Sequence, residues 1–390
     1  MRILLVHNHY GGYSGESAVM DAQEALLKSH GHEVRKYTRS SAEIDNMKFG
    51  KYWAFFSGIY NPASIRAMKK LLEEYRPDIV HIHNLYPLIS PSVLPQIHSM
   101  GIPVVMTVHN YRLVCPNGLF FNRFGICEKC EGGREWNCLR YNCLQSYNKS
   151  LGYALRNAWA RVAEYYLENV DAFLCLTEFH LEKLVLNGYA RERGHVLPNF
   201  FDGTNEPEYT KKRPGSYVAF AGRISREKGI DLIYNAARQL PDIPFKLAGG
   251  VGEQDIEAGK PSNVEVVGML KGASLQKFYQ DAALFLLSSV WYEGFPMVLL
   301  EAMNYGLPII CPRLGGLPEI VDDGITGMLY EAGNSVDLAK KIRIMWDDKG
   351  LLTEMGKASY AKMGREYLPD TYYYKLYEIY QSLEKSAKWS

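Results

Sequence analysis

Short apolar runs rich in β-branched residues alternate with amphipathic helical patterns along the whole chain. The segment 17–29 illustrates the helical pattern, because Val19, Ala22, Leu26 and Leu27 recur at the spacing of one helix face. The alternation of strand and helix is typical of βα units wound around parallel sheets. The predicted strands are 3–6, 34–37, 79–83, 103–108, 172–176 and 195–197 in a first series, and 218–221, 245–248, 264–267, 283–287 and 309–311 in a second.

The polar stretch 202–216, rich in Pro, Gly and charged residues, separates the two series and is the best linker candidate. The sequence therefore predicts an α/β protein with two doubly wound, Rossmann-like domains, 1–202 and 203–366. A helix over 367–390 follows, and we expect it to cross back to the first domain. In such folds ligands bind where the carboxyl ends of the strands converge, so we expect a cleft between the domains.

The composition of the chain excludes several classes of function. The chain has 390 residues, 47% hydrophobic and 22% charged, enough for two buried cores. Lys and Arg (44) nearly cancel Asp and Glu (43), which argues against a nucleic-acid partner. The apolar run 3–6 is too short for a signal peptide, and no stretch approaches the ~18 apolar residues of a spanning helix. We expect a cytoplasmic protein whose membrane contact, if any, is peripheral and at the inner face.

Arg223 and Lys228 follow the predicted strand 218–221, on a short loop that leads into a helix. Two cations at the carboxyl edge of a sheet suit a diphosphate, because Arg grips two oxygens at once and Lys supplies a mobile charge. Taken alone, most pairs at this spacing belong to an ordinary solvated loop.

Glu293 and Glu301 flank the start of a predicted helix that opens at Pro296, directly after a buried strand. The helix N-terminus offers free N–H groups and partial positive charge to phosphate oxygens. Eight helical residues span ~12 Å, the reach from a ribose across a diphosphate to a sugar. Taken alone, two glutamates at this spacing are more often one residue that interacts with the helix dipole and one ordinary surface residue. Here the position of the two glutamates after a buried strand, with Arg223 and Lys228 after an equivalent strand, favours a ligand site.

Three segments occur in an order that resembles a known family: GRISREKG (222–229), EGFPMVLLEA (293–302) and GLPEIV (316–321). The chain resembles the retaining glycosyltransferases of family 4, also called group 1, which have the two-domain GT-B fold. The resemblance implies a nucleotide-sugar donor, most often a UDP-sugar, and a glycan or lipid-linked glycan acceptor in polysaccharide biosynthesis. It also implies that no catalytic metal is needed.

The resemblance implies roles for residues of the second domain. Arg223 and Lys228 would hold the diphosphate, Glu293 would contact the donor sugar, and Glu301 would bind the ribose. The remaining donor-binding positions implied in this way are Leu270, Gly294, Phe295, Pro296 and Met297.

In the first domain the resemblance is looser. The segment GGYSGES (11–17) follows the first strand, and we expect Gly15 and Glu16 near the donor. His109, at the end of a strand, matches the active-site histidine of the family. His83 and Asn84 are candidates for the acceptor side, although a histidine at a strand end is more often structural.

Five of the seven cysteines lie within an insertion at 112–146. Four thiolates would satisfy tetrahedral zinc, so the insertion contains a candidate structural zinc site. Free thiols that simply pack together are the alternative, because only one C-x2-C pair is present. The four candidate ligands are Cys127, Cys130, Cys138 and Cys143.

The segment 48–72 mixes Lys with Trp, Phe and Tyr beside a helical pattern. It could rest on a membrane interface where a lipid-linked saccharide is presented. An aromatic lid packed on the first domain explains it equally well.

Other function classes fit less well. Neither first turn has the G-x-G-x-x-G of dinucleotide-binding oxidoreductases, and no G-x4-G-K-[ST] of P-loop proteins occurs. A non-catalytic nucleotide-sugar-binding protein and a GT-B nucleotide-sugar epimerase stay open as alternatives.

Overall fold

The computed structural model describes the chain except residues 13, 47–49, 204–214, 251–258 and 388–390, and the side chains of 51–54 and 386–387. The chain forms two compact units, Met1–Asn199 with Tyr372–Ser390 (unit 1) and Phe200–Thr371 (unit 2). Most of the predicted linker 202–216 lies outside the described residues.

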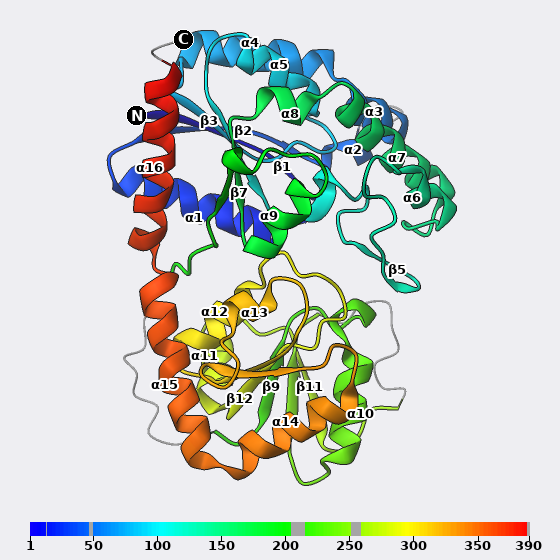
Figure 1. The fold of residues 1–390 in the computed structure, drawn as a ribbon, viewed down its shortest axis with the longest axis vertical. Coiled ribbons are helices and arrows are strands. Elements are labelled where there is room, and N and C mark those ends of the chain that lie inside the picture. The colour runs from blue at the N-terminus through cyan, green and yellow to red at the C-terminus, as the bar shows by residue number, and fades with distance from the viewer. Residues whose placement is uncertain (13, 47–49, 204–214, 251–258, 388–390) are drawn as a thin grey trace. The chain divides into compact units, whose positions relative to one another are not determined.

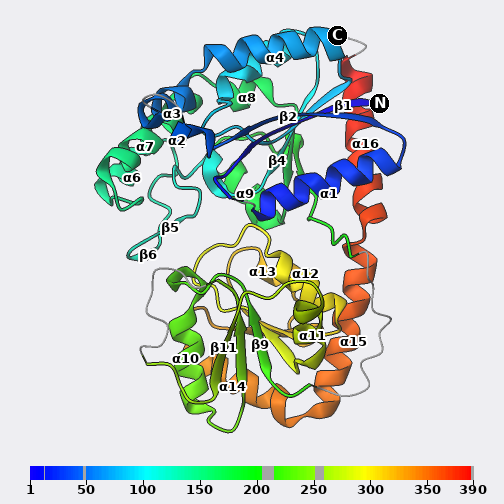
Figure 2. The same ribbon diagram turned by 180° about the vertical axis from the view of Figure 1, so that it is seen from behind.

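Unit 1 is built on a six-stranded sheet in the order β2-β1-β3-β4-β7-β8, with every pair parallel. The helices α4 (Pro62–Tyr75) and α5 (Leu94–His98) lie over one face, and α1 (Gly15–Ser29) and α9 (Glu178–Val185) lie over the other (Figures 1 and 2). Because both faces are covered, the inner strands β3, β4 and β7 are buried along their whole length, whereas the edge strands β2 and β8 are largely exposed or half-buried. Their bounds are β1 Arg2–His9, β2 Glu33–Ser40, β3 Ile79–Asn84, β4 Val104–Val108, β7 Ala172–Cys175 and β8 Gly194–Val196.

A long insertion between β4 and β7 contains a small hairpin and two helices that pack on each other, α6 and α7. Helix α3 (Gly50–Ile59) also packs on α7 (Tyr147–Val162). These helices gather at one edge of unit 1 in both views (Figures 1 and 2). The other elements here are α2 Glu43–Asn46, β5 Phe121–Asn122, β6 Gly125–Ile126, α6 Trp136–Arg140 and α8 Tyr165–Asn169.

The last helix, α16 (Pro369–Ala387), belongs to unit 1 from Tyr372 onward. The Tyr380 hydroxyl lies 2.5 Å from Nδ1 of His81 on β3, and Tyr373 stacks on His30 with ring centroids 3.6 Å apart. The C-terminal segment is therefore part of the packing around the first sheet.

Unit 2 has a second six-stranded parallel sheet, in the order β11-β10-β9-β12-β13-β14. Its strands are β9 Val218–Ala221, β10 Phe245–Ala248, β11 Val264–Gly268, β12 Leu284–Leu286, β13 Ile309–Pro312 and β14 Gly327–Tyr330. Its helices are α10 Ile230–Gln239, α11 Ala273–Asp281, α12 Met297–Asn304, α13 Leu317–Ile320, α14 Ser335–Asp347 and α15 Lys349–Glu366. The predicted fold class is confirmed, since both units are doubly wound α/β layers.

Strand β14 is missing from the sequence prediction. It begins with Gly327, where an added Cβ would meet the carbonyl oxygen of Ile309 at 1.9 Å. Close approach of the two backbones explains why glycine occupies this position, and glycine weakens the apolar pattern by which short strands are recognised.

Candidate active site

A pocket of about 450 Å3 lies in unit 2 at the carboxyl ends of β9, β10 and β11. Of the residues predicted from the sequence it brings together Arg223, Leu270 and Glu301. Gly249 directly follows β10, and its φ of 154° and close approach to the carbonyl oxygen of Gly222 leave no room for a side chain. The other lining residues are Ala221, Gly222, Ala248, Gly249, Gly250, Met269, Leu275, Tyr279 and Val298.

Glu301 is half-buried in this pocket and has one described hydrogen-bond partner, Tyr279. The Tyr279 hydroxyl donates to Oε2 over 2.6 Å, and the Tyr279 ring stacks on Tyr305 at 5.4 Å. Burial raises the pKa of the Glu301 carboxyl, and the hydrogen bond from Tyr279 partly opposes that shift. Tyr279 was not among the predicted site residues, because nothing in the local pattern of α11 distinguishes it from a core tyrosine.

Lys228 and Glu293 form a second group in unit 2. Lys228 Nζ lies 2.6 Å from Oε1 of Glu293, and their side chains are only 18% and 7% exposed. The same oxygen accepts from the Ser289 hydroxyl and, over 3.0 Å, from Nε1 of Trp291. A largely buried carboxylate is costly unless it is paired and hydrogen-bonded, and here one oxygen receives three donors.

Arg223 differs from Lys228 in its surroundings. Its side chain is 63% exposed and forms an ion pair with Glu227, four positions along the chain. The guanidinium is thus a surface cation at the rim of the pocket, whereas the Lys228 ammonium is held in place.

The turn Gly294–Phe295–Pro296 leads into α12, which begins at Met297. Pro296 has an extended backbone, with ψ of 101°, so the prediction that it is the first helical residue is wrong by one position. The Phe295 ring is buried and packs 5.9 Å from that of Tyr367. The first turn of α12 lies beside the pocket, because Val298 lines it. Its free N–H groups can therefore meet an anion bound there.

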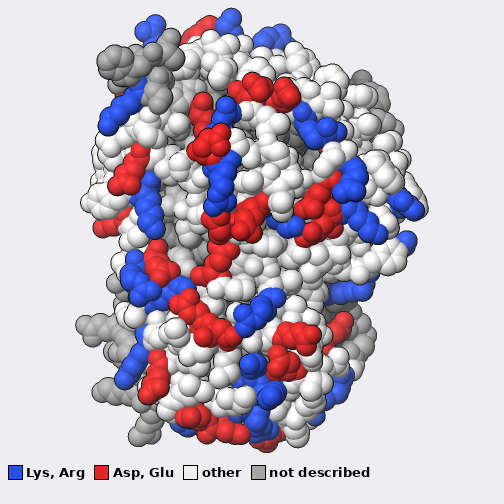
Figure 3. All heavy atoms as spheres, in the orientation of Figure 1, with Lys and Arg blue, Asp and Glu red and all other residues white. Residues whose placement is uncertain are grey.

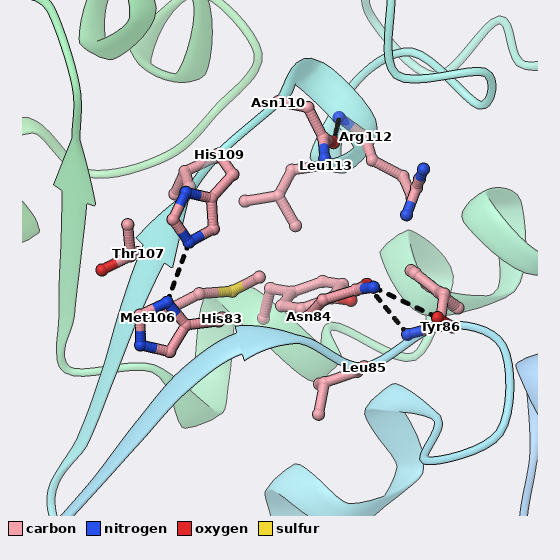
Figure 4. A pocket seen from close by; sticks show the side chains of 12 residues that line it. His83, Asn84, Leu85, Tyr86, Met106, Thr107, His109, Asn110, Arg112 and Leu113 are labelled. Atoms are coloured by element: carbon pink, nitrogen blue, oxygen red, sulfur yellow. Dashed lines mark hydrogen bonds between the residues drawn. The ribbon is translucent and has the colours of Figure 1, made fainter. Parts of the chain in front are cut away.

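In unit 1, His83 and His109 lie at the ends of neighbouring strands and line a small pocket (Figure 4). His83 Nδ1 and His109 Nε2 are 2.8 Å apart, and the rings stack at 5.1 Å. Burial lowers the pKa of His109 to about 4 and that of His83 well below its ordinary value. Both imidazoles are therefore neutral at physiological pH, and one of the two facing nitrogens carries the shared proton.

The structure gives His83 and Asn84 internal partners. His83 is 3% exposed and its Nδ1 is engaged by His109. The Asn84 side chain donates to the carbonyl oxygen of Asn8. It also donates to the carbonyl oxygen of Tyr86 and accepts from the Tyr86 N–H (Figure 4). Both residues thus hold the loop after β3 in place, and their assignment to the acceptor side stays a prediction.

Glu16 belongs to a polar network in the same unit. Gly15 and Glu16 open α1, and Oε1 of Glu16 accepts from Asn110 over 2.8 Å and from the Tyr10 hydroxyl over 3.2 Å. Arg112 donates to the same hydroxyl over 3.2 Å. Oε2 of Glu16 and Nε of Arg112 are buried without a hydrogen-bond partner among the described residues. Sequence reasoning missed Tyr10, Asn110 and Arg112, although Asn110 directly follows His109 and Arg112 lies two positions further on.

All seven cysteines are free thiols. Cys130 and Cys138 share a small core cluster, and Cys143 packs against it. Within the described part of the chain, no three His, Cys, Asp or Glu side chains are placed to hold one metal ion. The described geometry therefore does not supply a zinc ligand set, and zinc bound by Cys127 and these three thiols stays a prediction.

Two doubly wound parallel sheets with a pocket at the carboxyl ends of the strands place the chain in the GT-B class. It is similar to the crystal structure of HepE from Anabaena in complex with UDP and glucose, with a TM-score of 0.67, 18% identity and coverage of 98% of this chain and 100% of that one. It is also similar to sucrose-phosphate synthase from Thermosynechococcus elongatus, with a TM-score of 0.70, 18% identity and 99% of both chains covered. At these identities the likeness concerns the fold.

The family follows from the sequence models. Residues 203–362 match glycosyl transferases group 1, and residues 15–204 match glycosyltransferase family 4. The chain belongs to the group 1 (family 4) glycosyltransferases.

Curated relatives agree with this family. An uncharacterized glycosyltransferase of Methanocaldococcus jannaschii is 28% identical over 199 residues, which are 50% of this chain and 55% of that protein. A 42.6 kDa protein of the Klebsiella pneumoniae cps region is 23% identical over 352 residues, 82% of this chain and 87% of that one. The D-inositol 3-phosphate glycosyltransferase of an Arthrobacter species is 29% identical over 37% of each chain. The chain thus matches only about half, or less, of two of these three relatives.

Proposed function

We propose that this protein transfers a sugar from a UDP-sugar to a saccharide or lipid-linked saccharide, with retention of the anomeric configuration. The observation that carries the proposal is the unit 2 pocket, where Glu301, Arg223 and the first turn of α12 surround a space of about 450 Å3. A carboxylate suits ribose hydroxyls, and the cation and the helix N-terminus suit phosphate. Leu270 and Met269 offer an apolar surface to a base.

Charge stabilisation is the main catalytic contribution in this proposal. Arg223 and Lys228 would neutralise the diphosphate as it leaves, together with the N-terminus of α12. Lys228 is already oriented by Glu293, so it needs little reorganisation to meet a phosphate oxygen. Glu293 would in turn accept from hydroxyls of the donor sugar. The proposal assigns no catalytic metal, since these groups supply positive charge where the leaving group develops negative charge.

His109 enters the proposal as a neutral group. With a pKa of about 4 it carries no charge at physiological pH and can exchange hydrogen bonds with a sugar hydroxyl. His83 engages Nε2, so Nδ1 is the ring nitrogen left for substrate. In the front-face substitution that the family resemblance implies, the acceptor proton would pass to the leaving diphosphate. Glu16 would keep its hydrogen bonds to Asn110 and Tyr10 through Oε1.

Two comparisons support the choice of substrates. HepE was crystallised with UDP and glucose, and this chain covers that structure over its full length. The Klebsiella relatives lie in a cps region, in keeping with a role in polysaccharide biosynthesis. Within the described residues no helix has both the length and the apolarity to cross a membrane. A cytoplasmic location, with peripheral contact at the inner membrane face, is part of the proposal.

Release of free nucleoside diphosphate from a panel of nucleotide sugars tests the proposal, first alone and then with a mixed glycan and glycolipid extract. We expect release from one UDP-sugar, stimulated by the extract and abolished in Glu301→Gln. Thermal stabilisation by UDP without release under any condition would favour a non-catalytic binding protein. Conversion of the nucleotide sugar to its epimer without release would favour an epimerase.

A further inference from the structure

Helix α7 turns large apolar side chains toward the surface and small or polar ones toward the core, which is the reverse of the usual arrangement for a surface helix. Its exposed side chains include Tyr147, Leu151, Leu155 and Trp159, each four residues after the last, and Val162 one turn further on. Their exposed fractions range from 39% at Leu151 to 67% at Val162. The α7 residues buried against the rest of unit 1 are small or polar instead: Ser150, Gly152, Ala154, Arg156, Asn157 and Ala160.

A surface helix normally turns its apolar stripe toward the core and its polar face toward water. Single exposed apolar residues are common, but a contiguous row of them along four turns of a helix indicates an interaction surface. Even the buried Arg156 fits this reading, since its guanidinium is stacked 4.0 Å from the Tyr86 ring and 3.9 Å from that of Tyr153. The inner side of α7 is thus formed by small and polar residues and a stacked Arg156–Tyr153 pair, and the leucines lie on the outer side.

The apolar surface continues onto the neighbouring helices. Trp136 on α6 is 55% exposed, and α6 packs on α7. Phe56 and Tyr60, at the end of α3 and just after it, are 61% and 52% exposed, and α3 packs on α7 as well. We call the five exposed residues of α7 together with Trp136 the α7 face.

Basic residues outnumber acidic ones in the segment that carries the α7 face. Residues 131–164 contain five basic residues, Arg134, Arg140, Lys149, Arg156 and Arg161, and three acidic ones, Glu131, Glu135 and Glu164, in a chain whose total charges nearly cancel. Glu131 is paired with Lys183, and Glu164 is exposed just beyond the end of α7. Glu135 is buried and paired with Arg161 over 2.6 Å. Arg134, Arg140 and Lys149 are exposed, and none has a carboxylate within ion-pair distance in the described part of the chain. Figure 3 shows blue side chains along this edge of unit 1, with red ones beside them.

We infer that the α7 face docks on an anionic membrane surface. Leu151 and Leu155 would enter the boundary of the acyl chains, and Trp136, Tyr147 and Trp159 would lie at headgroup level. The exposed cations Arg134, Arg140 and Lys149, called here the basic rim, would meet lipid phosphates. This combination of an apolar stripe, interfacial aromatic residues and unpaired cations is the pattern of a helix that lies in the plane of a membrane. The sequence alone pointed to 48–72 for this role, a segment that is described only in part.

A second copy of the chain fits the same face less well. A two-fold dimer brings a patch onto itself, so Arg134, Arg140 and Lys149 would approach their own counterparts. Like charges brought together at an interface oppose association. Lipid phosphates, in contrast, complement the rim.

Flotation with vesicles tests the inference with the full chain. The probe is vesicles of phosphatidylcholine with about 30 mol% phosphatidylglycerol, an anionic content that attracts basic segments. Vesicles of phosphatidylcholine alone are the comparison. We expect the wild type to float with the anionic vesicles. Leu151→Gln with Leu155→Gln should lower the bound fraction about tenfold, because it removes apolar area from the interface. Ile325→Gln with Val336→Gln, at residues of unit 2 that are 61% and 64% exposed, is the matched control and should bind like the wild type.

A second variant keeps the test valid if the first one fails to fold. Arg140→Glu with Lys149→Glu should weaken binding to anionic vesicles and make the residual binding insensitive to salt. Wild-type protein that stays unbound at low ionic strength would overturn the inference. So would a dimer in sedimentation velocity that the leucine variant dissociates, since that outcome assigns the face to a second copy.

These readouts do not require transferase activity. Although a lipid-linked acceptor in the proposed function would explain why docking is useful, flotation can succeed even if no UDP-sugar is turned over. Release of UDP without acceptor should be unchanged in the α7 variants, because the α7 face has no residue in the unit 2 pocket.

Discussion

The hydrogen bond between Tyr279 and Glu301 allows a prediction with a matched control. Tyr279→Phe removes one hydroxyl and keeps the ring, which stacks on Tyr305 at 5.4 Å. The lost bond runs 2.6 Å from a hydroxyl to a carboxylate, and hydrogen bonds to charged groups contribute about 1.5–3 kcal/mol. In Tyr217→Phe the lost bond also measures 2.6 Å but ends on the neutral carbonyl of Phe278, so we expect a loss of about 1 kcal/mol.

The pH dependence separates the two variants further. Burial already holds the pKa of Glu301 above its ordinary value, and loss of the Tyr279 donor should raise it more. A raised carboxyl pKa favours the folded state below the unfolded pKa, and that advantage disappears as pH rises through the folded pKa. The free energy of unfolding lost in Tyr279→Phe should therefore be largest at neutral pH and shrink toward the value of a neutral bond in acid. The loss in Tyr217→Phe should change little with pH.

Urea unfolding at neutral and acid pH measures the stability, and titration calorimetry with UDP measures the effect on the site. If the Glu301 carboxylate accepts hydrogen bonds from ribose hydroxyls, Tyr279→Phe should bind UDP about tenfold more weakly, which corresponds to about 1.4 kcal/mol. The reason is that the carboxylate is less well oriented without the Tyr279 hydroxyl. Tyr217→Phe should leave UDP binding unchanged. Equal losses of stability in both variants, with equal UDP affinities, would refute the reasoning.

Three further predictions follow from the described contacts. Lys228→Ala should lower turnover by orders of magnitude and, by leaving Glu293 without its cation, reduce stability by about 3 kcal/mol; single-turnover kinetics beside urea unfolding check both, and unchanged turnover would remove Lys228 from the site. Burial lowers the pKa of His81 to about 3 and of His109 to about 4. Since the unfolded chain protonates these groups near pH 6.5, the free energy of unfolding should fall between about pH 6.5 and 4, by up to about 1.4 kcal/mol per pH unit for each histidine; calorimetry that finds equal midpoints at pH 7 and 5 would contradict this. Elemental analysis of protein purified without chelator tests the cysteine cluster, where zinc or iron far below one per chain would exclude a structural metal at Cys127, Cys130, Cys138 and Cys143.

Much of the architecture could be predicted from local patterns. Strands β9 and β10 were predicted at their observed bounds, and the two series of strands became two parallel sheets, because continuous apolar runs between amphipathic helices have few other stable arrangements. The family could be predicted as well, since the segments around Lys228, Glu293 and Glu301 are short and contiguous. Strand ends were less accurate: β1 extends to His9, past the last apolar residue, because its polar end residues continue the ladder with β2.

Partners across the chain could not be predicted in this way. Tyr279 and Glu301 are 22 positions apart, and His83 and His109 are 26 apart on neighbouring strands. Which side chains meet depends on strand order and helix docking, and neither is encoded in a local run of residues. The same holds for Tyr380, whose contact with His81 spans 299 positions.

The sequence by itself determined the class of protein, the order of its elements and the residues that match the family, because these depend on periodicity and on contiguous motifs. The tertiary structure decided which of those side chains are buried with fixed partners and which are exposed. It oriented Lys228 with Glu293, left Arg223 at a pocket rim, and turned the large apolar side chains of α7 outward. Burial is the physical reason. Packing against one face of a helix leaves the opposite face available to a partner, and a hydrogen bond to one nitrogen of an imidazole leaves only the other nitrogen available.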